Sequence, residues 1–305
     1  MSYATGTCTG HIALLDALKT FLEAQGWATK RYATGDVYEY VAMGPGLTGT
    51  DEIYIGIQTY TNSDSQYYNW KLRGYTGYSS LLDFASQPGA ISGTSNAPLL
   101  LTNGTIQYWF IVNSRRVIVI AKCGLSYECA YLGLIIPYAP ESQLSYPLFI
   151  GGSHNSVSNS YTEQEFEHFS FWNPQVSSSG SRPQSTFLAN NTWMSVVNRG
   201  GDGYGLVIHP YCGTPTSEES PSPTIYEFYS LRENIDGSFP VLPCILMSNY
   251  ASVTRGVYGE LDGVFGVPSI NNVPEDTITI GSDTYIIIAS AYRTSRRSYA
   301  AFKLE

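Results

Sequence analysis

The feature that most constrains the fold is a series of short segments in which apolar and polar residues alternate between glycine-rich turns. Such alternation is typical of β-strands that bury one face. It begins after Thr29, and in one segment Ile53, Ile55 and Ile57 fall on the same face of a strand. The strands predicted in this region are 37–43, 51–60 and 67–75.

Two stronger strands are predicted over 106–112 and 116–121, joined by a tight turn at Asn113–Arg115. The second contains the continuous apolar run Val117–Ile120, which indicates a strand covered on both faces. Residues 129–136 fit either a buried strand or a short helix. The last strands are predicted over 277–280, 285–289 and 300–304.

One clear helix is predicted near the N-terminus, over residues 11–25. Five apolar residues repeat there at helical spacing and form a single stripe. Thr9 stands where an N-cap residue belongs, and Gly26 stands where a C-cap glycine belongs. The residues of the stripe are Leu14, Leu15, Leu18, Phe21 and Leu22.

These patterns predict an α+β N-terminal domain over 1–150, in which one long helix packs on an antiparallel sheet. Residues 151–160 are rich in Gly, Ser and Asn and are the predicted linker. Residues 161–305 show short strand patterns and long polar loops, which predict a mainly β, sandwich-like C-terminal domain.

Composition narrows the classes of function. Charged residues make up 13% of the 305 residues, whereas aromatic residues reach 14% and include 25 tyrosines, so a mostly disordered chain is excluded. The net charge of −9 argues against nucleic acid as the main partner. A tyrosine-rich, charge-poor composition favours protein–protein interfaces.

The sequence also indicates the cellular compartment in which the chain is made. We see no secretory signal, and the longest apolar runs are far too short for a membrane span. The five scattered cysteines predict small buried thiols instead of a disulfide framework or zinc site. We therefore expect synthesis in the cytoplasm. The cysteines are Cys8, Cys123, Cys129, Cys212 and Cys244.

No motif predicts a catalytic residue, a cofactor or a metal ion. Gly44, Gly46 and Gly49 spell a dinucleotide-binding pattern, but a strand pattern follows where that site needs a helix, so we interpret them as a hairpin turn. The cluster Glu163–His168 could hold a hard cation, and a solvated strand face is the favoured interpretation. A glycosidase pair of Glu260 and Asp262 stays a weaker possibility.

The predicted binding residues form an aromatic cluster with one arginine in residues 67–78. Such rings could stack on sugars or on a partner protein; half of them could instead belong to the core. The pairs Arg115-Arg116 and Arg296-Arg297 are predicted to carry solvated charge at hairpin ends, with interface salt bridges as the other option. The cluster consists of Tyr67, Tyr68, Trp70, Arg73, Tyr75 and Tyr78.

An ordered set of stretches resembles tail-associated virion proteins of tailed bacteriophages and prophages. The stretches are Thr5-Gly6-Thr7, the helix Leu14–Leu22, Gly26-Trp27, Gly44–Leu47, Asp51–Ile57, Tyr67–Gly74, Tyr108–Asn113 with Arg115-Arg116, Gly259–Val264 and Arg293-Thr294. They occur at both ends and through the first half, and the region from about 155 to 225 is less distinctive.

The resemblance implies a non-enzymatic structural component of a phage tail or baseplate, made in the cytoplasm of the host bacterium and located in the virion tail. Its expected partners are other tail or baseplate proteins and further copies of itself, as a trimer or hexameric ring. A receptor-binding or carbohydrate-binding tail module, contacting a host surface glycan, is the alternative. Rings near Trp172 or Trp193 could assist it. A polysaccharide-degrading enzyme is the third hypothesis.

Overall fold

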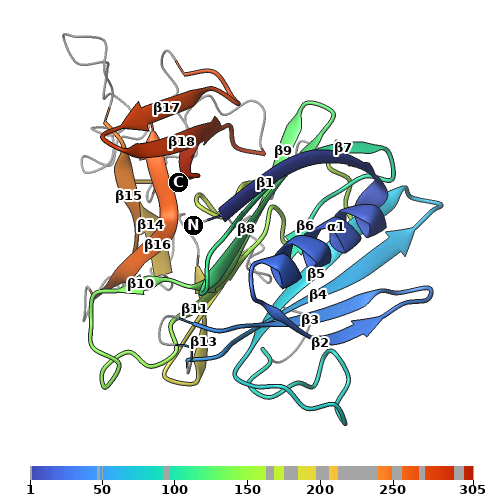
Figure 1. Ribbon diagram of the computed structural model, residues 1–305, viewed down its shortest axis with the longest axis horizontal. Helices are drawn as coiled ribbons and strands as arrows, with labels where there is room; N and C mark the ends of the chain where they lie inside the picture. The colour runs from blue at the N-terminus through green and yellow to red at the C-terminus, as the bar shows by residue number, and fades with distance from the viewer. Residues whose placement is uncertain are drawn as a thin grey trace, which may run out of the picture.

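The computed structural model describes residues 2–46, 49, 51–91, 97–162, 168–174, 185–196, 206–211, 240–248, 256–267, 272–291 and 299–304. Across these ranges the chain is mostly β, and one helix lies near the N-terminus (Figure 1). No helix in the described ranges combines the length and apolar character that crossing a membrane requires.

A five-stranded antiparallel sheet forms from the alternating segments of the first hundred residues. The predicted strands 37–43, 51–60 and 67–75 are confirmed as β3, β4 and β5. The glycine pattern lies where β3 turns into β4, which confirms the hairpin interpretation; Gly46 has a φ of +71° there. In sheet order the strands are β2 (Ala28–Ala33), β3 (Glu39–Gly44), β4 (Ile53–Asn62), β5 (Tyr67–Tyr75) and β6 (Ala97–Leu99).

A second, 14-stranded sheet contains all the other described strands. They are β1 (Ser2–Thr9), β7 (Thr105–Val112), β8 (Arg116–Cys123), β9 (Ser126–Leu134), β10 (Ile136–Pro137), β11 (Leu148–Gly151), β12 (Ser185–Ala189), β13 (Thr192–Val196), β14 (Leu206–His209), β15 (Leu242–Ser248), β16 (Val257–Val267), β17 (Thr277–Ile280), β18 (Asp283–Ile288) and β19 (Tyr299–Lys303). Their order is β1-β7-β8-β9-β11-β12-β13-β14-β15-β16-β19-β18-β17, and β10 pairs with β16. The hairpin of β7 and β8 and the three C-terminal strands were predicted; β1 was not.

Helix α1 (Gly10–Ala24) confirms the predicted helix. Gly26 follows its end with a φ of +84°, and the Trp27 N–H donates to the Leu22 carbonyl, so the glycine closes the last turn. Thr9 precedes the helix, but its side chain makes no capping hydrogen bond. The predicted stripe is buried between the two sheets, except that Phe21 is partly buried and stacks on Phe110.

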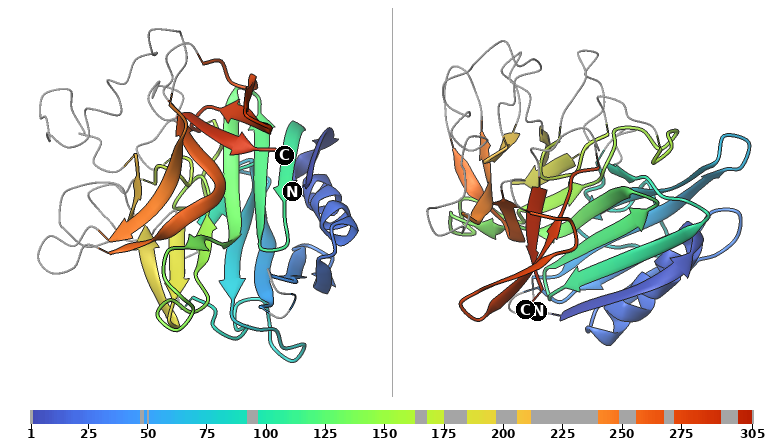
Figure 2. Two further views of the ribbon diagram at one scale, coloured as in Figure 1. Left: turned by 60° about the vertical axis from the view of Figure 1, so that its left-hand side comes forward. Right: turned by 90° about the horizontal axis from the view of Figure 1, so that it is seen from above.

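Two apolar cores lie on opposite faces of β7, β8 and β9. Val117 and Val119 belong to the core shared with α1 and the small sheet, whereas Ile118 and Ile120 belong to the core shared with the later strands. The later half of the large sheet therefore curls back over the far face of β7–β9 (Figure 2). This confirms the expectation that the run Val117–Ile120 is covered on both faces.

The large sheet continues through the region expected to separate two domains. Strand β11 pairs with β9 on one side and with β12 on the other. In the predicted linker, residues 151–154 are buried, and the Ser153 N–H donates to the Pro98 carbonyl. The division into two domains at 151–160 stays a prediction.

Candidate functional site

The predicted aromatic cluster does not form one surface, because strand alternation divides it between the two faces of β5. Tyr68 and Trp70 point toward the core side, where Trp70 has no exposed surface and its indole N–H donates to the His11 carbonyl at 3.0 Å. Tyr67, Arg73 and Tyr75 lie on the other face. Tyr67 and Tyr68 are partly exposed.

The segment 76–91 covers the end of the outer face of β5. The Tyr75 hydroxyl donates to the Phe84 carbonyl at 2.8 Å, and Arg73 donates to the Ala85 carbonyl at 3.0 Å. Tyr75 is fully buried and Arg73 nearly so, while Tyr78 packs partly buried against the same small core. The prediction of accessible rings is therefore wrong for Trp70 and Tyr75. It is also wrong for Trp172, which is fully buried.

A row of polar side chains remains open on the outer face of the small sheet, and we call it the polar strip. Its members are Arg31, Glu39, Gln58, Tyr60 and Lys71. Strand register places Gln58 beside both Glu39 and Lys71. Arg31 and Gln58 each bind Glu39, at 2.7 and 2.9 Å. At the far end, the Lys71 Nζ lies 5.2 Å from the centre of the Tyr60 ring.

Lys71 is the distinctive group of the polar strip. Burial lowers the pKa of its ammonium, the nearby Tyr60 raises it, and Arg73 lowers it. Among the ion pairs of the described residues, none involves Lys71, whereas Arg31 at the other end of the strip is paired. A half-buried cation beside an aromatic ring and an amide can bind an anionic or hydroxyl-rich ligand.

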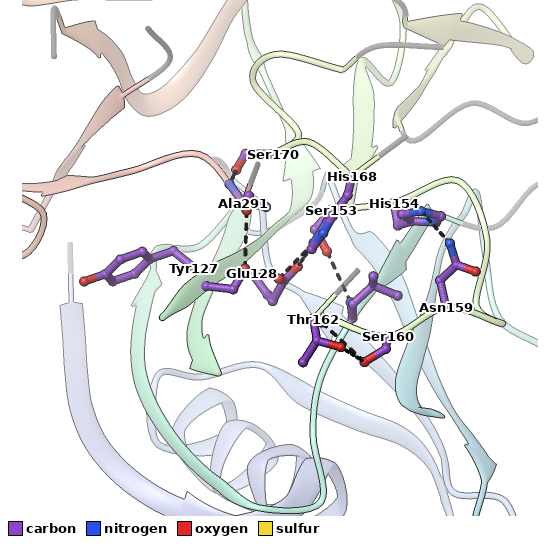
Figure 3. A network of polar contacts seen from close by, with 12 residues as sticks. Tyr127, Glu128, Ser153, His154, Asn159, Ser160, Thr162, His168, Ser170 and Ala291 are labelled. Carbon is purple, nitrogen blue, oxygen red and sulfur yellow. Dashed lines mark hydrogen bonds and ion pairs between the residues drawn. The ribbon is translucent and has the colours of Figure 1, made fainter. Parts of the chain in front are cut away.

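A second candidate is a buried carboxylate–imidazole pair, shown in Figure 3. His168 Nε2 lies 2.9 and 3.0 Å from the two carboxylate oxygens of Glu128, and the Ser126 hydroxyl donates to Glu128 at 2.6 Å. The ring of His154 lies 5.8 Å from that of His168. Glu128 and His168 are 0% and 2% exposed, so no substrate reaches them in this arrangement, and we interpret the pair as structural. The acidic cluster Glu163–Glu167 lies outside the described residues.

A third polar cluster joins the β7–β8 hairpin to β16. Asp262 Oδ2 lies 3.4 Å from Arg115 and 3.8 Å from Arg116, and it accepts a hydrogen bond from the Asn113 amide at 2.7 Å. The Arg116 side chain has no exposed surface, so the prediction of solvated charge is wrong for this residue; the hairpin end is covered by β16. Arg296-Arg297 lies outside the described residues.

Glu260 and Asp262, the hypothetical glycosidase pair, have different partners. Asp262 forms ion pairs with Arg115 and Arg116, whereas Glu260 accepts a hydrogen bond from the Tyr138 hydroxyl at 2.8 Å. Within the described residues, no three or more His, Cys, Asp or Glu side chains are placed to hold a metal ion. Cys123, Cys129 and Cys244 are buried free thiols, as predicted. Cys8 is a free thiol that is only partly buried, and Cys212 lies outside the described residues.

The outer edge of β1 is a candidate functional feature that the sequence patterns did not predict. β1 forms one end of the large sheet and pairs with β7 alone among the described strands. Its eight residues carry no charged side chain. The alternation of β-branched Thr5, Thr7 and Thr9 is the signal that could have predicted a strand here.

A scan against protein-family models and a comparison with curated protein sequences both found no match for this chain.

Proposed function

We propose that this chain is a structural component of a bacteriophage tail or baseplate that acts through protein–protein assembly. The observation that carries the proposal is the open edge of β1, because a long, uncharged sheet edge is a template for pairing with another chain. The ordered sequence resemblance described above supplies the tail context. The proposal includes synthesis in the host cytoplasm, location in the virion tail, and partners among the other tail proteins.

The polar features of the described residues support assembly over catalysis. The buried groups that could do proton chemistry, Glu128 and His168, bind each other away from solvent, and Asp262 is held by two arginines. The proposal therefore assigns no catalytic residue. It retains the division into an assembly domain over 1–150 and a sandwich-like domain over 161–305.

Purified phage particles test this proposal. We expect quantitative mass spectrometry of such particles to find the chain in fixed stoichiometry with tail proteins, and a reconstruction of the particle to place it in the tail. A chain that is missing from purified particles, in a host lysate that contains it, contradicts the proposal.

Binding to a host surface glycan is the second candidate function, and the polar strip favours it. Stacking on Tyr60 or Tyr67 and hydrogen bonds from Gln58 and Lys71 are the contacts that a saccharide requires. A glycan array probed with the full chain tests this, with K71A as the site variant. K30A is the matched control, because Lys30 is an exposed lysine at the edge of the same sheet. Equal glycan binding by K71A and K30A would exclude the polar strip as the glycan-binding site.

A further inference from the structure

Among the described strands, β1 is a long and regular edge strand that is open on one side. It pairs with β7 in an unbroken register from Ser2 opposite Val112 to Thr9 opposite Thr105. No described strand pairs with its other side. Every second residue is exposed, and Tyr3 is 42% exposed. The exposed residues are Tyr3, Thr5, Thr7 and Thr9.

The backbone groups that β1 presents outward can be identified. The Gly10 N–H donates to the Gly104 carbonyl at 2.9 Å, one position beyond the pair of Thr9 and Thr105. In an antiparallel ladder, hydrogen-bonded and non-hydrogen-bonded pairs alternate. The even-numbered residues of β1 therefore bond to β7. Tyr3, Thr5 and Thr7 direct their N–H and C=O groups away from the sheet, and so does the Thr9 N–H, whereas the Thr9 carbonyl begins the hydrogen bonding of α1.

The other open edges of the two sheets are protected. β2 has a register irregularity between Thr29 and Arg31 and an exposed lysine at position 30. β6 has only three residues, one of them Pro98. β17 has four residues, preceded by the exposed Asp276. Proteins use bulges, charges, prolines and short strands to prevent edge pairing, and β1 has none of these devices.

We propose that β1 is a self-association edge, where a second copy of this chain adds its own β1 in antiparallel orientation. A two-fold axis at Gly6 places Thr5 opposite Thr7 and Tyr3 opposite Thr9 of the other copy. The two pairs of Thr5 with Thr7 contribute two hydrogen bonds each, and the two pairs of Tyr3 with Thr9 contribute one each through the Thr9 N–H, which gives about six interchain hydrogen bonds. Threonines opposite one another are favourable cross-strand neighbours.

The sequence of β1 favours a second copy as the occupant of this edge, because the strand is uncharged and can pair with itself. The chain carries a net charge of −9, so two copies repel each other over most approaches. β1 contributes no charge, and its outward groups are self-complementary in the antiparallel arrangement. The inference rests on the proposed assembly function and names its surface. A two-fold contact is isologous and pairs the copies, so it fits a hexamer built from three dimers, and it fits neither a trimer nor a ring closed by head-to-tail contacts alone.

The variant T5P tests this edge. Proline removes the outward N–H of residue 5 and breaks no hydrogen bond to β7, since residue 5 is not bonded to that strand. We expect sedimentation equilibrium of the full chain to give a dimer, or a larger even-numbered assembly, and T5P to weaken the two-fold association at least tenfold. T5V is the matched control: it keeps the N–H and the branched shape and should associate like the unchanged protein.

A second variant tests the same edge in case T5P does not fold. T5K/T7K places like charges on the same edge without altering the backbone, and it should also abolish the dimer. Circular dichroism and the urea midpoint establish that each variant is folded. A monomeric unchanged protein, or folded variants that associate like the unchanged protein, would overturn the inference. Both of these results would leave the proposed tail location untested, because that location is tested separately by the presence of the chain in purified particles.

Discussion

Loss of the Asp262 charge should destabilise the protein strongly, because the fully buried guanidinium of Arg116 and the partly buried one of Arg115 both depend on it. Asp262 lies 3.4 Å from Arg115 and 3.8 Å from Arg116, and the exposed fractions of the Asp262 and Arg116 side chains are 9% and 0%. Removing one partner of a buried ion pair costs about 3–5 kcal/mol, because the other charge stays desolvated. These distances exceed those of direct charge-assisted hydrogen bonds, so we expect the lower end, about 3 kcal/mol.

The variant D262N keeps the size of the side chain and an oxygen that can accept from Asn113. Equilibrium urea denaturation should show a lower midpoint with an unchanged slope. The control E260Q alters a partly exposed carboxylate on the same strand, which binds only the Tyr138 hydroxyl in the described structure; its free energy of unfolding should change by less than about 1 kcal/mol.

A double-mutant cycle with R116M isolates the pairwise contribution. We expect a coupling energy of about 1–3 kcal/mol between positions 262 and 116, as for residues within one ion-pair network. Equal midpoints for D262N and E260Q, or a coupling energy near zero, would refute the view that Asp262 neutralises the hairpin arginines.

The other predictions concern core and polar groups. Burial lowers the pKa of His11 to about 4, so between pH 6.5 and pH 4 the unfolded state binds a proton that the folded state does not, and the free energy of unfolding should fall as the pH is lowered through this window. An NMR titration of the His11 ring checks the pKa, and H11Q should show a weaker pH dependence; a normal pKa near 6.5 would contradict the burial. W70A should reduce the free energy of unfolding by about 3–5 kcal/mol, since it empties a fully buried site, whereas Y67A on the outer face should cost much less. Thermal and urea unfolding compare the two, and equal losses would contradict the division of the aromatic cluster. E128Q replaces the buried carboxylate that contacts His168 and Ser126 and should destabilise the protein by about 1–3 kcal/mol, because a buried hydrogen-bonding partner is left unsatisfied; a stable variant would argue against a structural role for the pair.

Local patterns in the sequence were sufficient for most of the elements near the N-terminus. The leucine stripe, the flanking Gly26 and the alternating isoleucines act over a few residues, so periodicity alone locates α1 and β4. The continuous run Val117–Ile120 likewise predicted a strand covered on both faces. Residues 129–136 were open to two interpretations, and the β-sheet pairing of β9 decided between them.

The candidate site was predicted less well, and the reason differs between its parts. Strand alternation could have separated Tyr67, Arg73 and Tyr75 from Tyr68 and Trp70, but it could not say which face is buried. That choice depends on α1 and on segment 76–91, which cover opposite faces of the small sheet. Part of the aromatic-rich stretch 67–78 therefore belongs to the core, and only the polar strip remains accessible on the outer face of the small sheet.

The sequence by itself determined the β-rich class, the single N-terminal helix and the scarcity of charge, because these follow from composition and short-range periodicity. Tertiary structure alone decided which polar groups are paired and which edge is open. Glu128 contacts His168, which lies 40 residues away in the sequence, and Asp262 contacts Arg116, which lies 146 residues away. β1 becomes an edge only because β7, about a hundred residues later, binds one of its sides and leaves the other without a described partner.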